Sequence, residues 1–275
     1  AATKAFGRKT LLWDNYPVND FGESTGRLLL APYDRRQAGL ADELSGILSN
    51  PMNQEAPSRL AVTGSAAFAW NDLHYDPQAT TLFAARALAG GDEPTTEALL
   101  LLVDLEHLAP TFGSQPWQPQ APGLSALLLR VTDMLANGTP AERDAALRAL
   151  AAYADRLATA AGTIRAGVRD AGFLAQSAPW LEAMTLWGQA LQATTGGLAA
   201  ALRADQAGAT GLFTQAATHA AAAGALTTSP GPSRPQAPVV LGDGVLDQGP
   251  GFLVAVELEE LGRLSTLLVA EAVVA

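Results

Sequence analysis

The spacing of apolar residues predicts that the middle of the chain is a bundle of helices. Between residues 139 and 168, apolar side chains recur alternately three and four positions apart, which places them in one stripe along a helix. That stripe consists of Leu147, Leu150, Ala154, Leu157, Ala161, Ile164 and Val168. A second run that keeps to one helical face consists of Trp180, Met184, Trp187, Leu191, Leu198 and Leu202. Two such faces bury each other when their helices pack side by side.

Capping signals indicate where these helices begin and end. The segment from Thr139 to Glu142 fits a capping box with proline at the first helical position. Asn137-Gly138 ends the helix before it, and the polar segment from Thr194 to Gly197 predicts a bend in the second run. We therefore expect residues 94–225 to form an α-helical bundle domain.

The first 89 residues have the mixed pattern of an α/β unit. Strands are predicted at residues 9–13, 27–31 and 46–49, and helices at Gln37–Leu44, Pro57–Ala69 and Pro77–Ala89. After the bundle, residues 226–238 contain four prolines and predict a linker. The apolar tail, residues 239–275, is either a helix that docks on the bundle or the start of a further, truncated module.

Composition excludes several classes of function. Of the 275 residues, 48% are hydrophobic and 16% are charged, so the chain can bury a large core. The formal net charge of −10 argues against nucleic acid and against an anionic membrane surface as partners. The chain has no cysteine and therefore no disulfide, and no apolar run in it is long enough to span a membrane.

Candidate ligand-binding residues follow two of the predicted strands. The run Leu11-Leu12-Trp13 leads into Asn15, Tyr16 and Asp20, and a second apolar run ends at Asn50. Asn and Asp supply the paired acceptors and the amide donors that a hydroxyl-rich ligand needs. Each also has a purely structural interpretation, an Asx turn for Asn15 and Asp20 and a strand-ending residue for Asn50.

Other kinds of site find little support in the sequence. Tyr16 offers an apolar wall for a sugar face or a core residue, and Asn19 is interpreted as a turn residue. The three histidines lie far apart, and His107 lacks a second histidine four positions on, so we predict no metal site. No cysteine and no Gly-x-Ser-x-Gly elbow is present to supply a nucleophile. No cofactor is predicted.

A series of short motifs resembles one enzyme family. Trp13 to Asp20, Gly26 to Tyr33 and Ser49 to Asn53 occur in order, and the likeness continues through Trp70-Asn71 and Tyr75-Asp76-Pro77. They resemble the end of the catalytic barrel of glycoside hydrolase family 84, which contains β-N-acetylglucosaminidases, O-GlcNAc hydrolases and hyaluronidase-like enzymes. The implied fold is mainly α: the last strands of a (β/α)8 barrel over residues 1–89, followed by the helical bundle.

The resemblance also implies a reaction and the part this chain plays in it. Family members use the substrate's own acetamido oxygen as nucleophile, assisted by two adjacent aspartates, but no Asp-Asp pair occurs in this sequence. We therefore expect no catalytic residue in this chain, and we expect it to begin in the middle of a barrel whose N-terminal part is its partner. Asn15, Asp20, Asn50 and Tyr16 would bind the sugar. The implied partner is an N-acetylglucosamine-containing glycan or glycoprotein, and the implied location is extracellular or at the cell surface. The alternative is a non-catalytic helical spacer or protein-interaction module.

Overall fold

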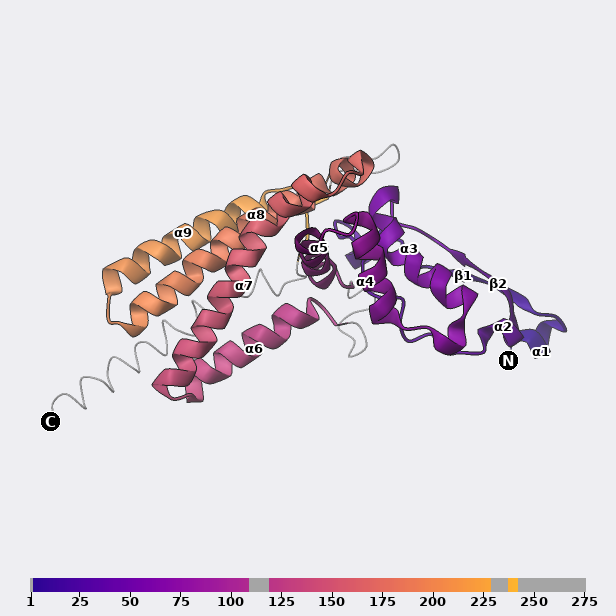
Figure 1. The fold of residues 1–275 in the computed structure, drawn as a ribbon, viewed down its shortest axis with the longest axis horizontal. Coiled ribbons are helices and arrows are strands. Elements are labelled where there is room, and N and C mark those ends of the chain that lie inside the picture. The colour runs from indigo at the N-terminus through magenta and orange to yellow at the C-terminus, as the bar shows by residue number, and fades with distance from the viewer. Residues whose placement is uncertain (1, 109–118, 229–236, 242–275) are drawn as a thin grey trace.

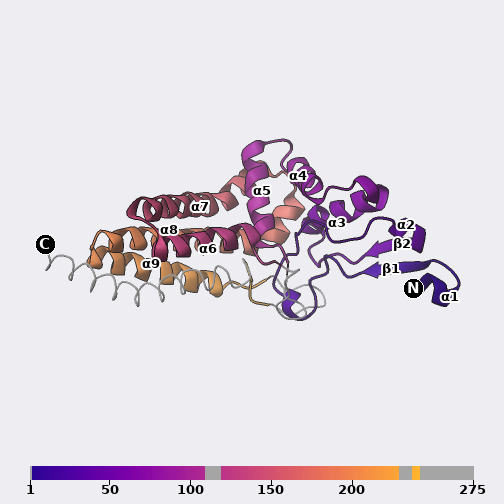
Figure 2. The same cartoon turned by 90° about the horizontal axis from the view of Figure 1, so that it is seen from below.

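The protein is mainly helical, as the sequence predicts, and it is elongated (Figure 1). A computed structural model describes residues 2–108, 119–228 and 237–241. A small sheet and its helices form one end, and long helices stacked in layers form the other (Figure 2). None of the helices in these ranges combines the length and the apolar character that a membrane span requires.

The sheet has two parallel strands, β1 (Thr10–Asp14) and β2 (Leu44–Ser49). Asp14 at the end of β1 pairs with Ser49 at the end of β2, so the carboxyl ends of both strands lie at the same edge. Around this sheet the chain forms α1 (Ala2–Phe6), η1 (Gly22–Ser24), α2 (Leu40–Glu43), α3 (Glu55–Trp70), η2 (Asp72–His74) and α4 (Pro77–Leu88). Helix α3 begins shortly after β2 and contacts that strand, which fixes the loop between them.

Two predictions about this end of the chain are wrong. Residues 27–31 form no strand, although Leu28, Leu29 and Leu30 are buried. Their main chain bonds to the end of a helix instead: Leu30 N donates to Glu106 O at 2.8 Å, and Leu28 N donates to the Glu106 carboxylate at 2.7 Å. A short apolar run indicates burial but does not identify the partner. The helix predicted over residues 37–44 shrinks to α2, because Leu44 already belongs to β2.

Within the described residues, the helical part is built from five further helices. They are α5 (Glu93–Leu105), α6 (Pro122–Asn137), α7 (Pro140–Gly167), α8 (Ala171–Leu202) and α9 (Gln206–Gly224). Every residue of the stripe predicted on α7 is buried, and so are the residues of the second run on α8 as far as Leu198. The predicted capping box also forms, with Thr139 and Glu142 bonded to each other's main chain at the start of α7.

Helix α8 continues through the segment where a bend was expected. Thr194 Oγ1 donates to Ala190 O at 2.9 Å, and Thr195 Oγ1 donates to Leu191 O at 2.8 Å. These bonds satisfy both hydroxyls inside the helix, so two buried polar residues do not interrupt it. Gly188, half-way along, lets the main chain of α7 pass close by, near Ala158.

The chain returns to the sheet end after α9. Val239 N donates to Leu226 O at 3.0 Å, and Val240 N donates to Gly26 O at 2.9 Å. Gly26 O also accepts a hydrogen bond from Trp180 Nε1 of α8 at 3.0 Å. Of the predicted linker, only the two ends belong to the described residues, and the predicted tail beyond residue 241 lies outside them.

Candidate functional site

The paired strand ends bring two of the four predicted sugar-binding residues into contact. Asn15 follows β1 and Asn50 follows β2, and Asn50 N donates to Asp14 O at 2.9 Å, which continues the strand pairing. Asn50 Nδ2 donates to Asn15 Oδ1 at 3.3 Å, and Trp13 Nε1 donates to the same oxygen at 2.8 Å. Asn15 is exposed and Asn50 is half-buried, so both side chains are accessible from solvent.

These bonds orient the two carboxamides. Because Asn15 Oδ1 accepts two hydrogen bonds, its amide nitrogen points the other way, and within the described residues that nitrogen donates to no group. The Oδ1 of Asn50 likewise accepts no bond from the described residues. The pair therefore offers one donor and one acceptor side by side, which is the set that a hydroxyl group can satisfy.

The other two predicted residues lie in the loop that follows β1. Asp20 is exposed at the surface of this loop. Tyr16 is half-buried against the main core, and its hydroxyl donates to the carbonyl of Ala31. Burial raises the pKa of Tyr16 far above its ordinary value, so the hydroxyl stays protonated. Its hydroxyl is engaged by the protein itself, which leaves only the ring of Tyr16 for contact with a ligand.

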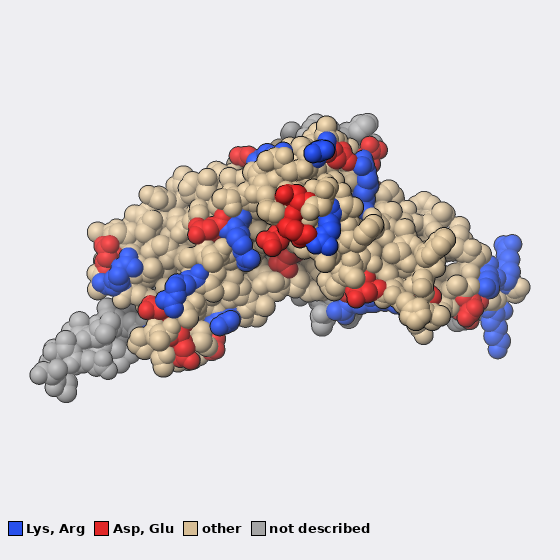
Figure 3. Space-filling model, in the orientation of Figure 1, with Lys and Arg blue, Asp and Glu red and all other residues tan. Residues whose placement is uncertain are grey.

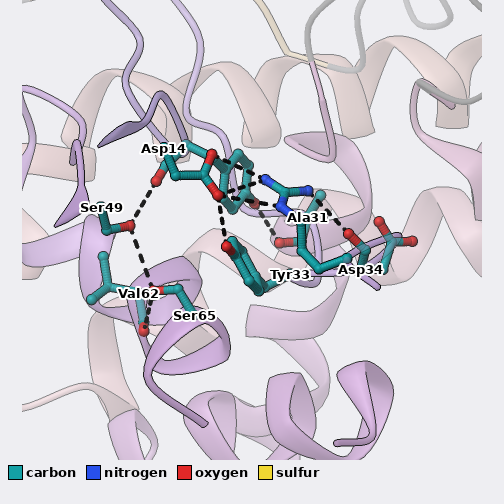
Figure 4. Close-up of polar contacts among 9 residues, drawn as sticks. Asp14, Ala31, Tyr33, Asp34, Ser49, Val62 and Ser65 are labelled. Carbon is teal, nitrogen blue, oxygen red and sulfur yellow. Dashed lines mark hydrogen bonds and ion pairs between the residues drawn. The ribbon is translucent and has the colours of Figure 1, made fainter. Parts of the chain in front are cut away.

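A partly buried charge network lies on the opposite side of the strand end (Figure 4). Asp14 accepts hydrogen bonds from Tyr33 OH at 2.6 Å and from Arg36 Nη2 at 3.0 Å, and the Arg36 guanidinium lies 4.4 Å from the centre of the Tyr33 ring. Burial, followed by the hydrogen bond to Asp14, raises the pKa of Tyr33 to about 12. Burial opposes the charge on Arg36, but the Asp14 carboxylate raises the pKa of the guanidinium above its ordinary value. Since side chains alternate along a strand, Asp14 anchors β1 to the irregular segment that carries Tyr33 and Arg36, while Trp13 and Asn15 point the other way.

Asn19 is a structural residue of this site that sequence reasoning missed. Its side chain is 5% exposed, and its Nδ2 donates to both Arg27 O and Gln54 Oε1 at 2.7 Å. Its Oδ1 accepts from Asn53 N at 3.0 Å. The sequence predicted a turn residue, because an asparagine that follows Pro17-Val18 and precedes Asp20 has no signal for burial; its partners are set by the tertiary fold.

The structure gives no support for a metal centre in the described part of the chain. No group of three or more His, Cys, Asp or Glu side chains there could hold a metal ion. His107 is partly buried, and burial lowers its pKa, whereas His74 is exposed. A cavity of about 730 Å³ lies between α3, α4 and the turn from α7 to α8, but neither strand end lines it.

Comparison with known proteins finds a family match over the first part of the chain. Residues 1–104 match the family model of beta-N-acetylglucosaminidase. This match confirms the resemblance that the motifs between Trp13 and Pro77 predict. The matched segment contains both strands, all four predicted sugar-binding residues and Asn19.

Solved structures of family 84 share the fold of nearly the whole chain. TM-scores are 0.80 for CpGH84D at 15% identity, 0.76 for CpGH84B at 18%, and 0.73 for a mutant of the Thermobaculum terrenum O-GlcNAc hydrolase at 23%. The alignments cover 95%, 92% and 95% of this chain but 41%, 40% and 52% of those structures. The chain thus spans about half, or less, of the length of these family 84 proteins, and at such identities the likeness shows the fold alone.

Proposed function

We propose that this chain supplies the sugar-binding side of a glycoside hydrolase that removes terminal N-acetylglucosamine. The observation that carries the proposal is the Asn15–Asn50 pair at the carboxyl ends of β1 and β2. In β/α barrels the ligand binds at this edge, because the loops that follow the strands converge there. The family match over residues 1–104 supports the same substrate class.

Each residue has a role that follows from its chemistry. The Asn15 amide would donate to an oxygen of the sugar, and the Asn50 carbonyl oxygen would accept from a neighbouring hydroxyl. Asp20, an exposed carboxylate, would accept hydrogen bonds from the outer hydroxyls. Trp13 is 63% exposed next to Asn15 and offers a flat apolar surface to the sugar ring.

The chemical step would need groups that this chain lacks. In substrate-assisted hydrolysis, one aspartate polarises the acetamido group while its neighbour exchanges protons with the leaving oxygen and with water. The sequence has no adjacent pair of aspartates. We therefore expect the isolated chain to bind N-acetylglucosamine without hydrolysing an aryl N-acetylglucosaminide.

A titration of the chain with N-acetylglucosamine, followed by ¹H–¹⁵N NMR, tests the proposal. We expect shifts of the Trp13 indole N–H and of the Asn15 and Asn50 side-chain amides. Asn15→Ala or Asn50→Ala removes about 1 kcal/mol of hydrogen bonding and should weaken binding roughly fivefold. Asn71→Ala is the matched control, because Asn71 is exposed at the far end of α3 and should leave binding unchanged.

Two results would contradict the proposal. If saturating N-acetylglucosamine shifts none of these resonances, the proposal is wrong and the result favours the alternative, a helical spacer or interaction module. Equal weakening by Asn15→Ala and Asn71→Ala would show that the strand ends are not the binding site.

A further inference from the structure

Hydrogen bonds fix the loop that carries Asp20 at two places, which we call its pins. The first pin is the buried Asn19 carboxamide, which donates to Arg27 O and so closes the loop over residues 20–26. The second is Gly26 O, which accepts hydrogen bonds from Trp180 of α8 and from Val240. Between these pins, Phe21 and Glu23 are exposed together with Asp20.

The same carboxamide also holds the loop that follows Asn50. Asn53 N donates to Asn19 Oδ1 at 3.0 Å, and the second proton of Asn19 Nδ2 goes to Gln54 Oε1 at 2.7 Å. That second loop is rigid in its own right. Ser58 Oγ accepts from Met52 N at 3.0 Å and donates to Gln54 O at 2.8 Å, which ties the loop to the first turn of α3.

We propose that Asn19 is a positioning residue that fixes the Asp20 loop against the Asn50 loop and so sets the separation of the two sugar contacts. The proposal rests on the function proposed above for Asp20 and Asn50. Both amide protons and the carbonyl oxygen of Asn19 are bonded inside the protein. The residue therefore has nothing left to offer a ligand and acts only through its neighbours.

Aspartate and alanine, two small replacements, cannot make all three bonds at this place. Aspartate keeps the bond from Asn53 N but turns two acceptors, Arg27 O and Gln54 Oε1, toward a carboxylate. Alanine leaves these groups unpaired in a site that is 5% exposed. Either change frees the Asp20 loop at Asn19 while the pin at Gly26 remains.

We call the three hydrogen bonds of the Asn19 side chain the clamp. Distances between spin labels test, without any ligand, whether the clamp holds the two loops together. The chain has no cysteine, so Phe21→Cys and Glu55→Cys create two unique labelling sites, one beside Asp20 and one at the start of α3. Both side chains are exposed and neither belongs to the clamp. We expect one narrow distance distribution in the labelled chain and a broad one when Asn19→Ala is added, below the temperature at which circular dichroism shows unfolding.

A control variant and a milder variant separate the effect on loop position from an effect on stability. Asn71→Ala should leave the distribution narrow. Gln54→Ala removes one of the three bonds and should broaden the distribution less than Asn19→Ala does; it also provides a folded variant if Asn19→Ala fails to fold. Affinity for N-acetylglucosamine should fall roughly tenfold with Asn19→Ala, the loss expected when a charged acceptor such as Asp20 is misplaced.

The outcomes are distinct. A narrow distance distribution in a folded Asn19→Ala chain contradicts the proposed positioning role. The role is also contradicted if Asn19→Ala broadens the distribution but leaves the affinity for N-acetylglucosamine unchanged. If the unsubstituted chain binds no sugar, the proposed function fails and the positioning role fails with it, while the distances still decide whether Asn19 joins the two loops.

Discussion

Gly188 marks a place where the main chains of α7 and α8 pass close together, and replacing it tests the packing of the bundle. A Cβ atom on Gly188 would lie 2.3 Å from Ala158 N and 2.4 Å from Ala158 Cα. Cβ atoms essentially never lie within 3.0 Å of other heavy atoms, and the main chain of a packed helix cannot move aside at one residue. Gly188→Ala therefore has to push the two helices apart by roughly 1 Å along a seam of fully buried side chains.

The expected cost follows from two opposing effects. Alanine gains about 1 kcal/mol over glycine in helix propensity. Against this, overpacking costs about 1–3 kcal/mol, and the contacts of neighbouring Leu157, which is 0% exposed, loosen as well. Because the clash involves main-chain atoms, we expect the upper end of that range and a net loss of about 2 kcal/mol in the free energy of unfolding.

Urea unfolding followed by circular dichroism at 222 nm measures this loss. Gly162→Ala in α7 is the matched control, since a Cβ there meets no atom within 4 Å. That variant should gain about 0.5–1 kcal/mol from helix propensity alone. The reasoning is refuted if Gly188→Ala is as stable as Gly162→Ala.

Two further predictions concern the charge network and the tyrosines. Asp14→Asn leaves Arg36 without its carboxylate and should lower the free energy of unfolding by about 2 kcal/mol, whereas Glu93→Gln, which breaks the exposed pair with Arg86, should cost less than about 0.5 kcal/mol; equal losses in urea unfolding would contradict the burial argument. Burial raises the pKa of all four tyrosines, to about 12 for Tyr33 and Tyr75, so the folded chain favours neutral tyrosine. Stability should be complete below pH 10 and fall as pH rises through 12, and absorbance at 295 nm should show no step near pH 10 while the chain stays folded.

Helical periodicity predicted the bundle well, because the spacing of apolar residues along each helix indicates which side chains are buried. In α7 every third or fourth residue is apolar, and the helix buries that stripe whatever its neighbours are. Helix ends were equally local, since Thr139 and Glu142 satisfy each other within one turn. The family resemblance depended on contiguous motifs in the same way.

Features decided by distant partners were not predictable. Residues 27–31 have the pattern of a strand, yet Leu28 and Leu30 bond to Glu106, which lies far along the chain. Asn19 has the sequence signature of a turn, and its burial depends on Gln54 and Asn53 in a separate loop. The sequence predicted that Asn15 and Asn50 belong to one site. Which of their groups donates and which accepts depends on the register of the two strands, which the structure supplies.

The carbonyl of Gly26 has a consequence for the order in which the chain acquires its structure. It belongs to the loop that bears Asp20, but its two donors are Trp180, 154 residues further on, and Val240. A ribosome adds about 5–20 residues per second, so roughly 10–40 s pass between the synthesis of Gly26 and that of its donor Val240. The loop is synthesised before the helices that follow it, and its hydrogen bond from Val240 forms after them. Until Val240 is made, the bonds of Gly26 O and Asn19 that can hold the Asp20 loop are those to α8 and to the segments around Arg27 and Gln54.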